Sequence, residues 1–280
     1  MLKRPRPSSP PSKRFLHRSN SAPVILAGSP EPRLAVPLLP RRSRGLRARP
    51  RYRPEMSALA NGVWEAYAVE YGRHTDRQVY ENFTAPLPPS FPRPDAPMPL
   101  SFYIWLLRSG DHVIAVDTGF AEAEARARGR ETLLSVEAAL AALGVGRDKV
   151  GDVILTHLHW DHAGNHDLFP NARIHVQATE MAYCTGPCMC HAALRKPYDP
   201  ASVATLVKRV HAGHVRFHEG TAEIAPGVFV HLVGGHTRGL QVVTVETRRG
   251  RLVFIKILIP DASSFPNLLI SSIFELEAPK

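Results

Sequence analysis

Four metal-binding side chains fall within six residues of this 280-residue sequence, directly after a short apolar segment. The apolar segment, residues 153–155, is typical of a buried strand, and the side chains that follow it are His157, His159, Asp161 and His162. At the end of a strand, side chains two positions apart point the same way, so His157 and His159 can bind one cation together. A turn in the chain then lets Asp161 and His162 face a second cation. The spacing predicts a metal centre at a strand end, and the simpler interpretation is a polar loop with solvated histidines.

Two later segments supply further candidate ligands. His236 lies in the sequence GGHTRG, where the glycines allow close approach of the backbone around a single histidine. Asp261 follows an expected strand and can bridge two metals. For His236 alone a structural histidine is the simpler interpretation, but the cluster upstream favours a metal-binding role. Mixed nitrogen and oxygen donors suit zinc best, with iron, cobalt or manganese as alternatives.

Short strands and amphipathic helices alternate along the chain from residue 63, without a strict strand–helix–strand rhythm. We expect strands at residues 101–108, 112–116, 153–155, 172–177, 228–233, 240–246 and 252–259, and helices at residues 131–143 and 201–211. This alternation predicts a layered α/β protein with mixed sheets.

Four short motifs occur in a fixed order along the chain. They are VDTG at residues 116–119, THLHWDHAGN at 156–165, GGHTRG at 234–239 and DAS at 261–263. Together they resemble the metallo-β-lactamase superfamily of αββα metallohydrolases, and within it the N-acyl homoserine lactonase group. The resemblance spans about residues 63–265 and implies an αββα metallo-β-lactamase-like sandwich for a hydrolase domain at residues 56–280.

The resemblance implies two metal sites, and therefore two zinc ions per chain. His157, His159 and His236 would hold the first metal, Asp161 and His162 the second, and Asp261 both. Asp117 would support the floor of the site. Asp161 would also be catalytic, by orienting the attacking hydroxide or moving its proton.

The end of the sequence departs from the family's pattern. The family supplies one more histidine to the second metal from a loop well after the bridging aspartate, whereas no histidine follows Asp261 here and only 19 residues remain. Ser264 stands where lactonases place a tyrosine. We therefore expect a sandwich that is incomplete at its C-terminus, with too few ligands at the second metal.

These features together predict a metal-dependent hydrolase. A divalent metal held by imidazoles and carboxylates lowers the pKa of its bound water to about 7, which gives a hydroxide that can open a lactone or ester. The resemblance makes an N-acyl homoserine lactone the leading substrate, with quorum quenching as the role. Three alternatives stay open: a thioesterase of the glyoxalase II type, an inactive metal-binding relative, and an RNA-processing nuclease of the same superfamily.

The net charge of +10 lies entirely in the N-terminal segment. Residues 1–55 hold 14 Lys and Arg, two Glu and eleven Pro, so residues 56–280 are left with 21 basic and 23 acidic side chains. Prolines interrupt both helices and sheets, which predicts a disordered basic extension. This extension can be a nucleic-acid-binding tail, a transit peptide or the product of a start codon read upstream of Met56. A nucleic-acid partner is not favoured, because few aromatic residues accompany the basic ones.

Cysteine content bears on the compartment. The three cysteines, Cys184, Cys188 and Cys190, are too few and too closely spaced for a disulfide framework, so a reducing compartment and a cytoplasmic location are expected. Their spacing lacks the CxxC pattern of structural zinc sites, which favours free thiols over an accessory metal site. No apolar run reaches about 18 residues, so no membrane span is expected. The partner expected from the predicted activity is a small-molecule lactone or ester.

Overall fold

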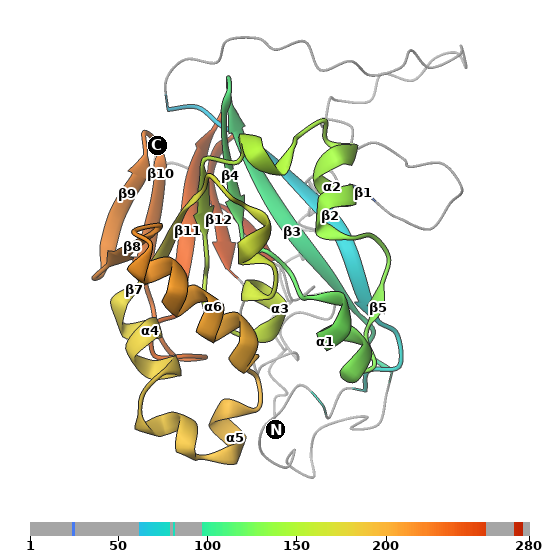
Figure 1. Cartoon of the computed structure of the whole chain (residues 1–280). Helices are drawn as coiled ribbons and strands as arrows, with labels where there is room; N and C mark the ends of the chain where they lie inside the picture. The colour runs from blue at the N-terminus through green and yellow to red at the C-terminus, as the bar shows by residue number, and fades with distance from the viewer. Residues whose placement is uncertain (1–23, 26–61, 79–80, 82–96, 256–271, 277–280) are drawn as a thin grey trace, which may run out of the picture.

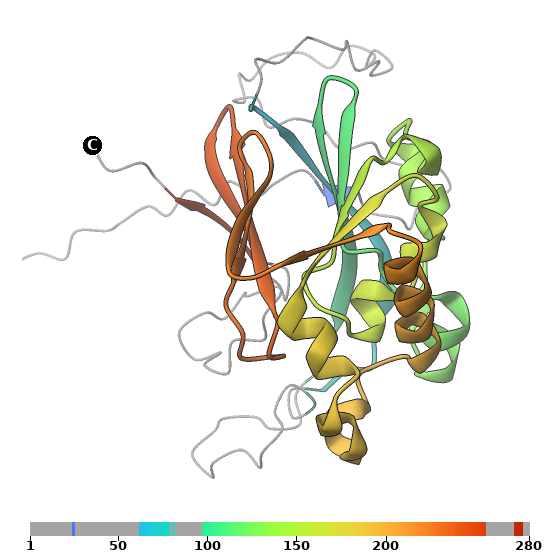
Figure 2. The same ribbon diagram turned by 60° about the vertical axis from the view of Figure 1, so that its left-hand side comes forward.

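Two β-sheets pack face to face, and helices cover the outer face of the larger sheet (Figures 1 and 2). The computed structural model describes residues 24–25, 62–78, 81, 97–255 and 272–276. The described residues therefore supply both sheets and one helical layer of the expected αββα sandwich. Asp261 and most of residues 1–55 lie outside the described residues, so the expected disorder of the extension and the expected C-terminal incompleteness stay predictions.

The larger sheet has the strand order β1-β2-β3-β4-β6-β7-β8, and β5 pairs with β2. Its strands are β1 (Val24–Ile25), β2 (Glu65–His74), β3 (Leu100–Ser109), β4 (His112–Val116), β5 (Glu131–Thr132), β6 (Asp152–Ile154), β7 (Arg173–Gln177) and β8 (Val215–His218). Strands β4, β6, β7 and β8 are parallel, whereas β2, β3 and β4 pair antiparallel. The carboxyl ends of β4 and β6 consequently meet at one edge of the sheet.

The smaller sheet is wholly antiparallel, in the order β13-β12-β11-β10-β9. Its strands are β9 (Thr221–Ala225), β10 (Val228–Leu232), β11 (Gln241–Thr247), β12 (Gly250–Ile255) and β13 (Ser272–Leu276). The connection from β10 to β11 carries the GGHTRG segment, and it reaches the edge where β6 ends, because the Gln241 N–H donates to the Thr156 carbonyl at 2.9 Å.

Six α-helices are present among the described residues. They are α1 (Glu122–Ala127), α2 (Val136–Ala142), α3 (Trp160–Ala163), α4 (Ala178–Cys184), α5 (Ala192–Arg195) and α6 (Pro200–His211), with 3-10 turns at Arg147–Lys149, His166–Leu168 and Pro187–Cys190. None of these helices is long and apolar enough to cross a membrane.

Both faces of the larger sheet are buried, which explains its nearly continuous apolar strands. In β3, Ile104 and Leu106 belong to the apolar cluster under the helices, whereas Trp105 and Leu107 belong to the cluster between the sheets. A strand whose two faces are both covered needs apolar side chains at every position, and an alternating pattern is therefore absent here.

The structure differs from the predicted elements in one helix boundary and in several elements that were not predicted. The expected helix at residues 131–143 is too long: residues 131–132 form β5 against β2, and the helix begins after Ser135, whose hydroxyl caps it by accepting the Ala138 N–H at 3.1 Å. Strands β2, β8 and β9 and helix α1 were not among the predicted elements. A two-residue strand, β1, also lies within the segment where no regular element was expected.

Candidate metal centre

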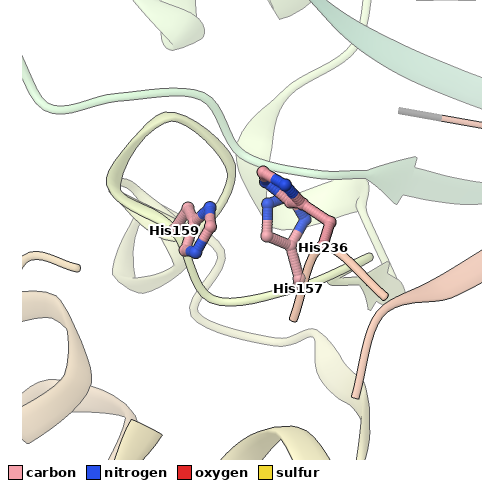
Figure 3. A group of neighbouring side chains, drawn as sticks. All are labelled: His157, His159 and His236. Carbon is pink, nitrogen blue, oxygen red and sulfur yellow. The ribbon is translucent and has the colours of Figure 1, made fainter. Parts of the chain in front are cut away.

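Three predicted histidines meet at the carboxyl end of β6. His157 and His159 follow the strand, His236 comes from the β10–β11 connection, and one nitrogen of each ring lies within 4.8 Å of the other two (Figure 3). The ring centroids are 4.5 Å apart for His157 and His159, 5.0 Å for His157 and His236, and 4.6 Å for His159 and His236. His157 and His159 are buried and His236 is exposed, so the cluster reaches the protein surface through His236.

Asp161 and His162 lie beside these histidines, in the first turn of α3. The ring centroids of His157 and His162 are 3.9 Å apart. The imidazole of His162 lies between the carboxylates of Asp117 and Asp161. Its Nδ1 is 2.8 Å from Asp117 Oδ2 and its Nε2 is 3.3 Å from Asp161 Oδ2. A neutral imidazole has a single N–H, so with the proton on Nδ1 the Nε2 lone pair faces a carboxylate oxygen. Two facing lone pairs suit a shared cation, so these residues fit a metal.

The VDTG segment forms the floor of the site. Asp117 has a positive φ of 60°, a backbone conformation that Asp tolerates better than most residues. One oxygen of its carboxylate accepts the Thr156 N–H at 2.8 Å, the Thr156 hydroxyl lies at 2.9 Å from both oxygens, and His162 contacts the other oxygen. Asp117 thus orients a candidate ligand from beneath, as the resemblance implied.

Close backbone packing fixes the two loops against each other. The Gly164 N–H donates to the Gly119 carbonyl at 2.8 Å, and a Cβ on Gly164 would lie only 2.7 Å from the Ala121 nitrogen. Asn165 adds side-chain hydrogen bonds to the carbonyls of Thr118 and Phe120, at 3.0 and 2.6 Å. Only glycine fits at position 164, so the loop carrying the histidines is held rigidly on the VDTG segment.

The pKa values of two of the candidate ligands are lowered. Desolvation, aided by the neighbouring His236, lowers the pKa of His159 to about 3. Desolvation and the neighbouring His162 also lower the pKa of His236. A metal binds the unprotonated imidazole, so these shifts keep the nitrogen lone pairs available at neutral pH.

Sequence reasoning missed a buried carboxylate behind the histidines, that of Glu180 in α4. It accepts backbone N–H groups from Leu158 and Gly239, both at 3.0 Å, and the Tyr198 hydroxyl at 3.2 Å. The ring of Tyr198 in turn packs against His159, with centroids 4.7 Å apart. No local motif surrounds Glu180, and its partners lie 18 to 59 residues away in sequence. An acidic residue at the start of a helix was the only available signal.

Other residues near the site do not join the histidine cluster. Trp160, between His159 and Asp161, is buried and stacks on Phe120, with ring centroids 5.3 Å apart. Cys184, Cys188 and Cys190 are free cysteines and do not group with histidine or acidic residues into a candidate metal site in the described part of the chain. Asp261, the expected bridging ligand, lies outside the described residues.

Known proteins with similar sequences and folds are hydrolases and lactonases. The N-acyl homoserine lactonase AiiA of Bacillus thuringiensis subsp. kurstaki is 29% identical over 206 residues, which cover 64% of this chain and 76% of the relative. A probable metal-dependent hydrolase from Staphylococcus aureus has a similar fold, with a TM-score of 0.55 at 20% identity over 70% of this chain and 73% of that one. The dizinc quorum-quenching lactonase AidC has a TM-score of 0.52 at 20% identity, over 70% and 71% of the two chains.

The family assignment rests on more than half of the chain. The profile of the metallo-beta-lactamase superfamily matches residues 99–255, a span that includes the VDTG, HxHxDH and GGHTRG segments. The matched span also contains the strands that bring His157, His159 and His236 together. This chain therefore belongs to the metallo-beta-lactamase superfamily.

Proposed function

We propose that this protein is a metal-dependent hydrolase that opens a lactone or cleaves a related ester, with an N-acyl homoserine lactone as the leading substrate. The observation that carries the proposal is the convergence of three histidines from two separate loops. The relatives named N-acyl homoserine lactonase support the substrate class.

Each candidate residue has a distinct part in this proposal. His157, His159 and His236 would hold the first cation, and Asp161 and His162 would take part in holding the second, together with Asp261. When bound, a divalent cation acidifies water and polarises a carbonyl group. The similarly folded lactonase AidC is a dizinc protein, which supports zinc here, with iron, cobalt or manganese as alternatives.

Asp161 is the candidate for proton handling. Its side chain is about one-fifth exposed, whereas the side chain of His162 beside it is nearly buried. Its backbone carbonyl accepts the hydroxyl of Tyr71 at 3.2 Å, which fixes the residue relative to β2. An accessible carboxylate held beside the histidines can orient a water molecule and accept its proton, and this is the role we assign to it.

The decisive experiment combines metal analysis with substrate panels on the full chain. We expect turnover of N-acyl homoserine lactones, with about two zinc ions per chain if the second site is complete and about one if it lacks ligands. His157→Ala should bind less zinc and lose turnover, whereas His211→Ala, at an exposed position on α6, should match the wild type.

The same measurements distinguish the alternatives. Turnover of thioesters in preference to lactones would indicate a thioesterase of the glyoxalase II type. A folded protein that binds one metal or none and turns over neither substrate would overturn the proposal in favour of an inactive relative. Cleavage of RNA in the same panel would instead indicate a nuclease.

A further inference from the structure

The carboxylate of Glu180 lies where the two histidine-bearing loops come together. Its exposed fraction is 0%, and it accepts three hydrogen bonds, each from a different segment of the chain. Leu158, one donor, stands between His157 and His159. Gly239, another donor, stands three residues after His236. One side chain therefore joins both loops that supply the candidate ligands.

The backbone of Gly239 packs directly against Glu180. A Cβ on Gly239 would lie 2.2 Å from the Glu180 backbone nitrogen and 2.3 Å from its Cα, so the two backbones touch. Tyr198, the third donor, also packs its ring on His159. Two of the three donors, Leu158 and Tyr198, thus adjoin a candidate ligand directly, and the third, Gly239, lies in the loop that carries His236.

The chemistry of the contact requires a carboxylate. Burying a carboxylate is unfavourable unless donors surround it, and all three partners of Glu180 are donors. A glutamine side chain of the same shape has one acceptor oxygen, and its amide group would face an N–H group. Retaining the charge here costs stability that an apolar or amide side chain at a merely structural position would avoid.

We propose that Glu180 is a positioning residue that sets the spacing of His157, His159 and His236, and through that spacing the affinity of the first metal site. The inference rests on the proposed function only in assuming that these histidines bind a cation. It adds a residue from α4, a helix that contributes no ligand, to the machinery of the site.

The test measures zinc affinity of the full chain by competition with a chromophoric chelator. Glu180→Gln should weaken zinc binding by about 10- to 100-fold, the range found when partners of metal ligands are removed. Tyr198→Phe, which removes only one donor, should cause a smaller loss. Excess zinc should restore turnover to Glu180→Gln, since the variant keeps all the candidate ligands.

A matched control is available in Glu70, which is also 0% exposed and pairs with Arg73 on β2 at 2.6 Å. Glu70→Gln should lower the melting temperature without changing zinc affinity more than about twofold, because the ion pair that it breaks lies within β2 and involves neither histidine-bearing loop. If Glu180→Gln does not fold, Tyr198→Phe, which removes one donor and keeps the ring on His159, still tests the contact and should weaken zinc binding by a smaller factor.

Two outcomes would overturn the inference. The first is a folded Glu180→Gln with wild-type zinc affinity or, where that variant does not fold, a folded Tyr198→Phe with wild-type zinc affinity. The second is a wild-type protein that binds none of zinc, iron, cobalt or manganese, which would also overturn the proposed function. A wild type that binds zinc but hydrolyses no substrate contradicts the proposed function alone, because the affinity comparison still decides the role of Glu180.

Discussion

At the scale of single residues, the candidate ligands stand out in the sequence, whereas Glu180 behind them does not. His157, His159, Asp161 and His162 are adjacent in the chain, so their spacing is itself informative. Glu180 contacts residues that are distant in sequence, and a lone glutamate in a helix is ordinarily a surface residue. Asp117 was inferred only because the VDTG segment resembles a known family.

The orientation of His162 by Asp117 leads to a prediction about tautomers. Asp117→Asn keeps the size and tolerates the positive φ, but its amide can present an N–H to Nδ1 of His162 and drive the proton to Nε2. We expect metal affinity and turnover to fall by about 10- to 100-fold, as measured by chelator competition and lactone hydrolysis.

Asp152→Asn is the matched control for that variant. Asp152 is a buried aspartate that also contacts a histidine, since its carboxylate lies 2.8 Å from His175 Nε2, but it begins β6 at the opposite end from the site. Burial opposes its ionisation, but the hydrogen bonds from His175, Arg173 and His112 outweigh burial and lower its pKa. The control should lose stability and keep metal affinity; equal metal affinities in both variants would contradict the role of Asp117.

At the scale of elements, prediction succeeded where one residue pattern decides the structure. The parallel core strand at residues 153–155 is short and wholly apolar, and β6 lies there. Strands β8 and β9 are polar at the exposed positions Arg216 and Glu223, and their pairing with β7 and β10 supplies the order that their own sequences do not. Helix α2 begins later than the apolar spacing suggested because β2 takes residues 131–132 as a paired strand.

The attachment of α6 to the 3-10 turn His166–Leu168 should depend on pH. His166 is buried and donates from Nε2 to the Ser202 carbonyl at 3.0 Å, and burial lowers its pKa although this hydrogen bond opposes the shift. The unfolded chain, with an ordinary histidine pKa near about 6.5, binds the proton more readily than the folded chain. The contribution of His166 to the free energy of unfolding is therefore fully present above about pH 6.5, and it is lost as the pH falls from there through the lowered pKa of His166 in the folded protein.

The corresponding variant is His166→Gln, which can donate to the same carbonyl and does not titrate. Between about pH 7 and pH 5, the wild type should lose more free energy of unfolding than the variant, by at most about 1.4 kcal/mol per pH unit. His211→Gln, at an exposed position of the same helix, should follow the wild type. Parallel pH profiles for the wild type and His166→Gln would show that His166 does not couple protonation to folding.

At the scale of the whole molecule, the charge and the chemistry are separate. The fourteen basic residues of the N-terminal segment lie outside the span of residues 117–239 that holds every described residue of the site. We propose, as the sequence suggested, that residues 56–280 form the hydrolase domain.

A chain starting at Met56 tests that division. It lacks β1, a strand of two residues at the edge of the larger sheet, and it keeps all candidate ligands. We expect zinc content and turnover within about twofold of the full chain, since edge strands contribute little when so short. A loss of zinc binding on truncation, in a protein that still folds by circular dichroism, would show that the N-terminal segment belongs to the catalytic unit.

The strands place the candidate metal centre and two exposed turns at opposite ends of the sheets. All described site residues gather where β4 and β6 end and β10 passes to β11, whereas the β3–β4 turn at Gly110 and Asp111 and the β11–β12 turn at Arg248 and Arg249 lie at the other end and are exposed. A Cβ on Gly110 would meet no atom within 4 Å. A fluorophore or an immobilisation tag attached at these turns would lie at the opposite end from the candidate metal centre, so the immobilised protein should keep the zinc affinity of the free protein.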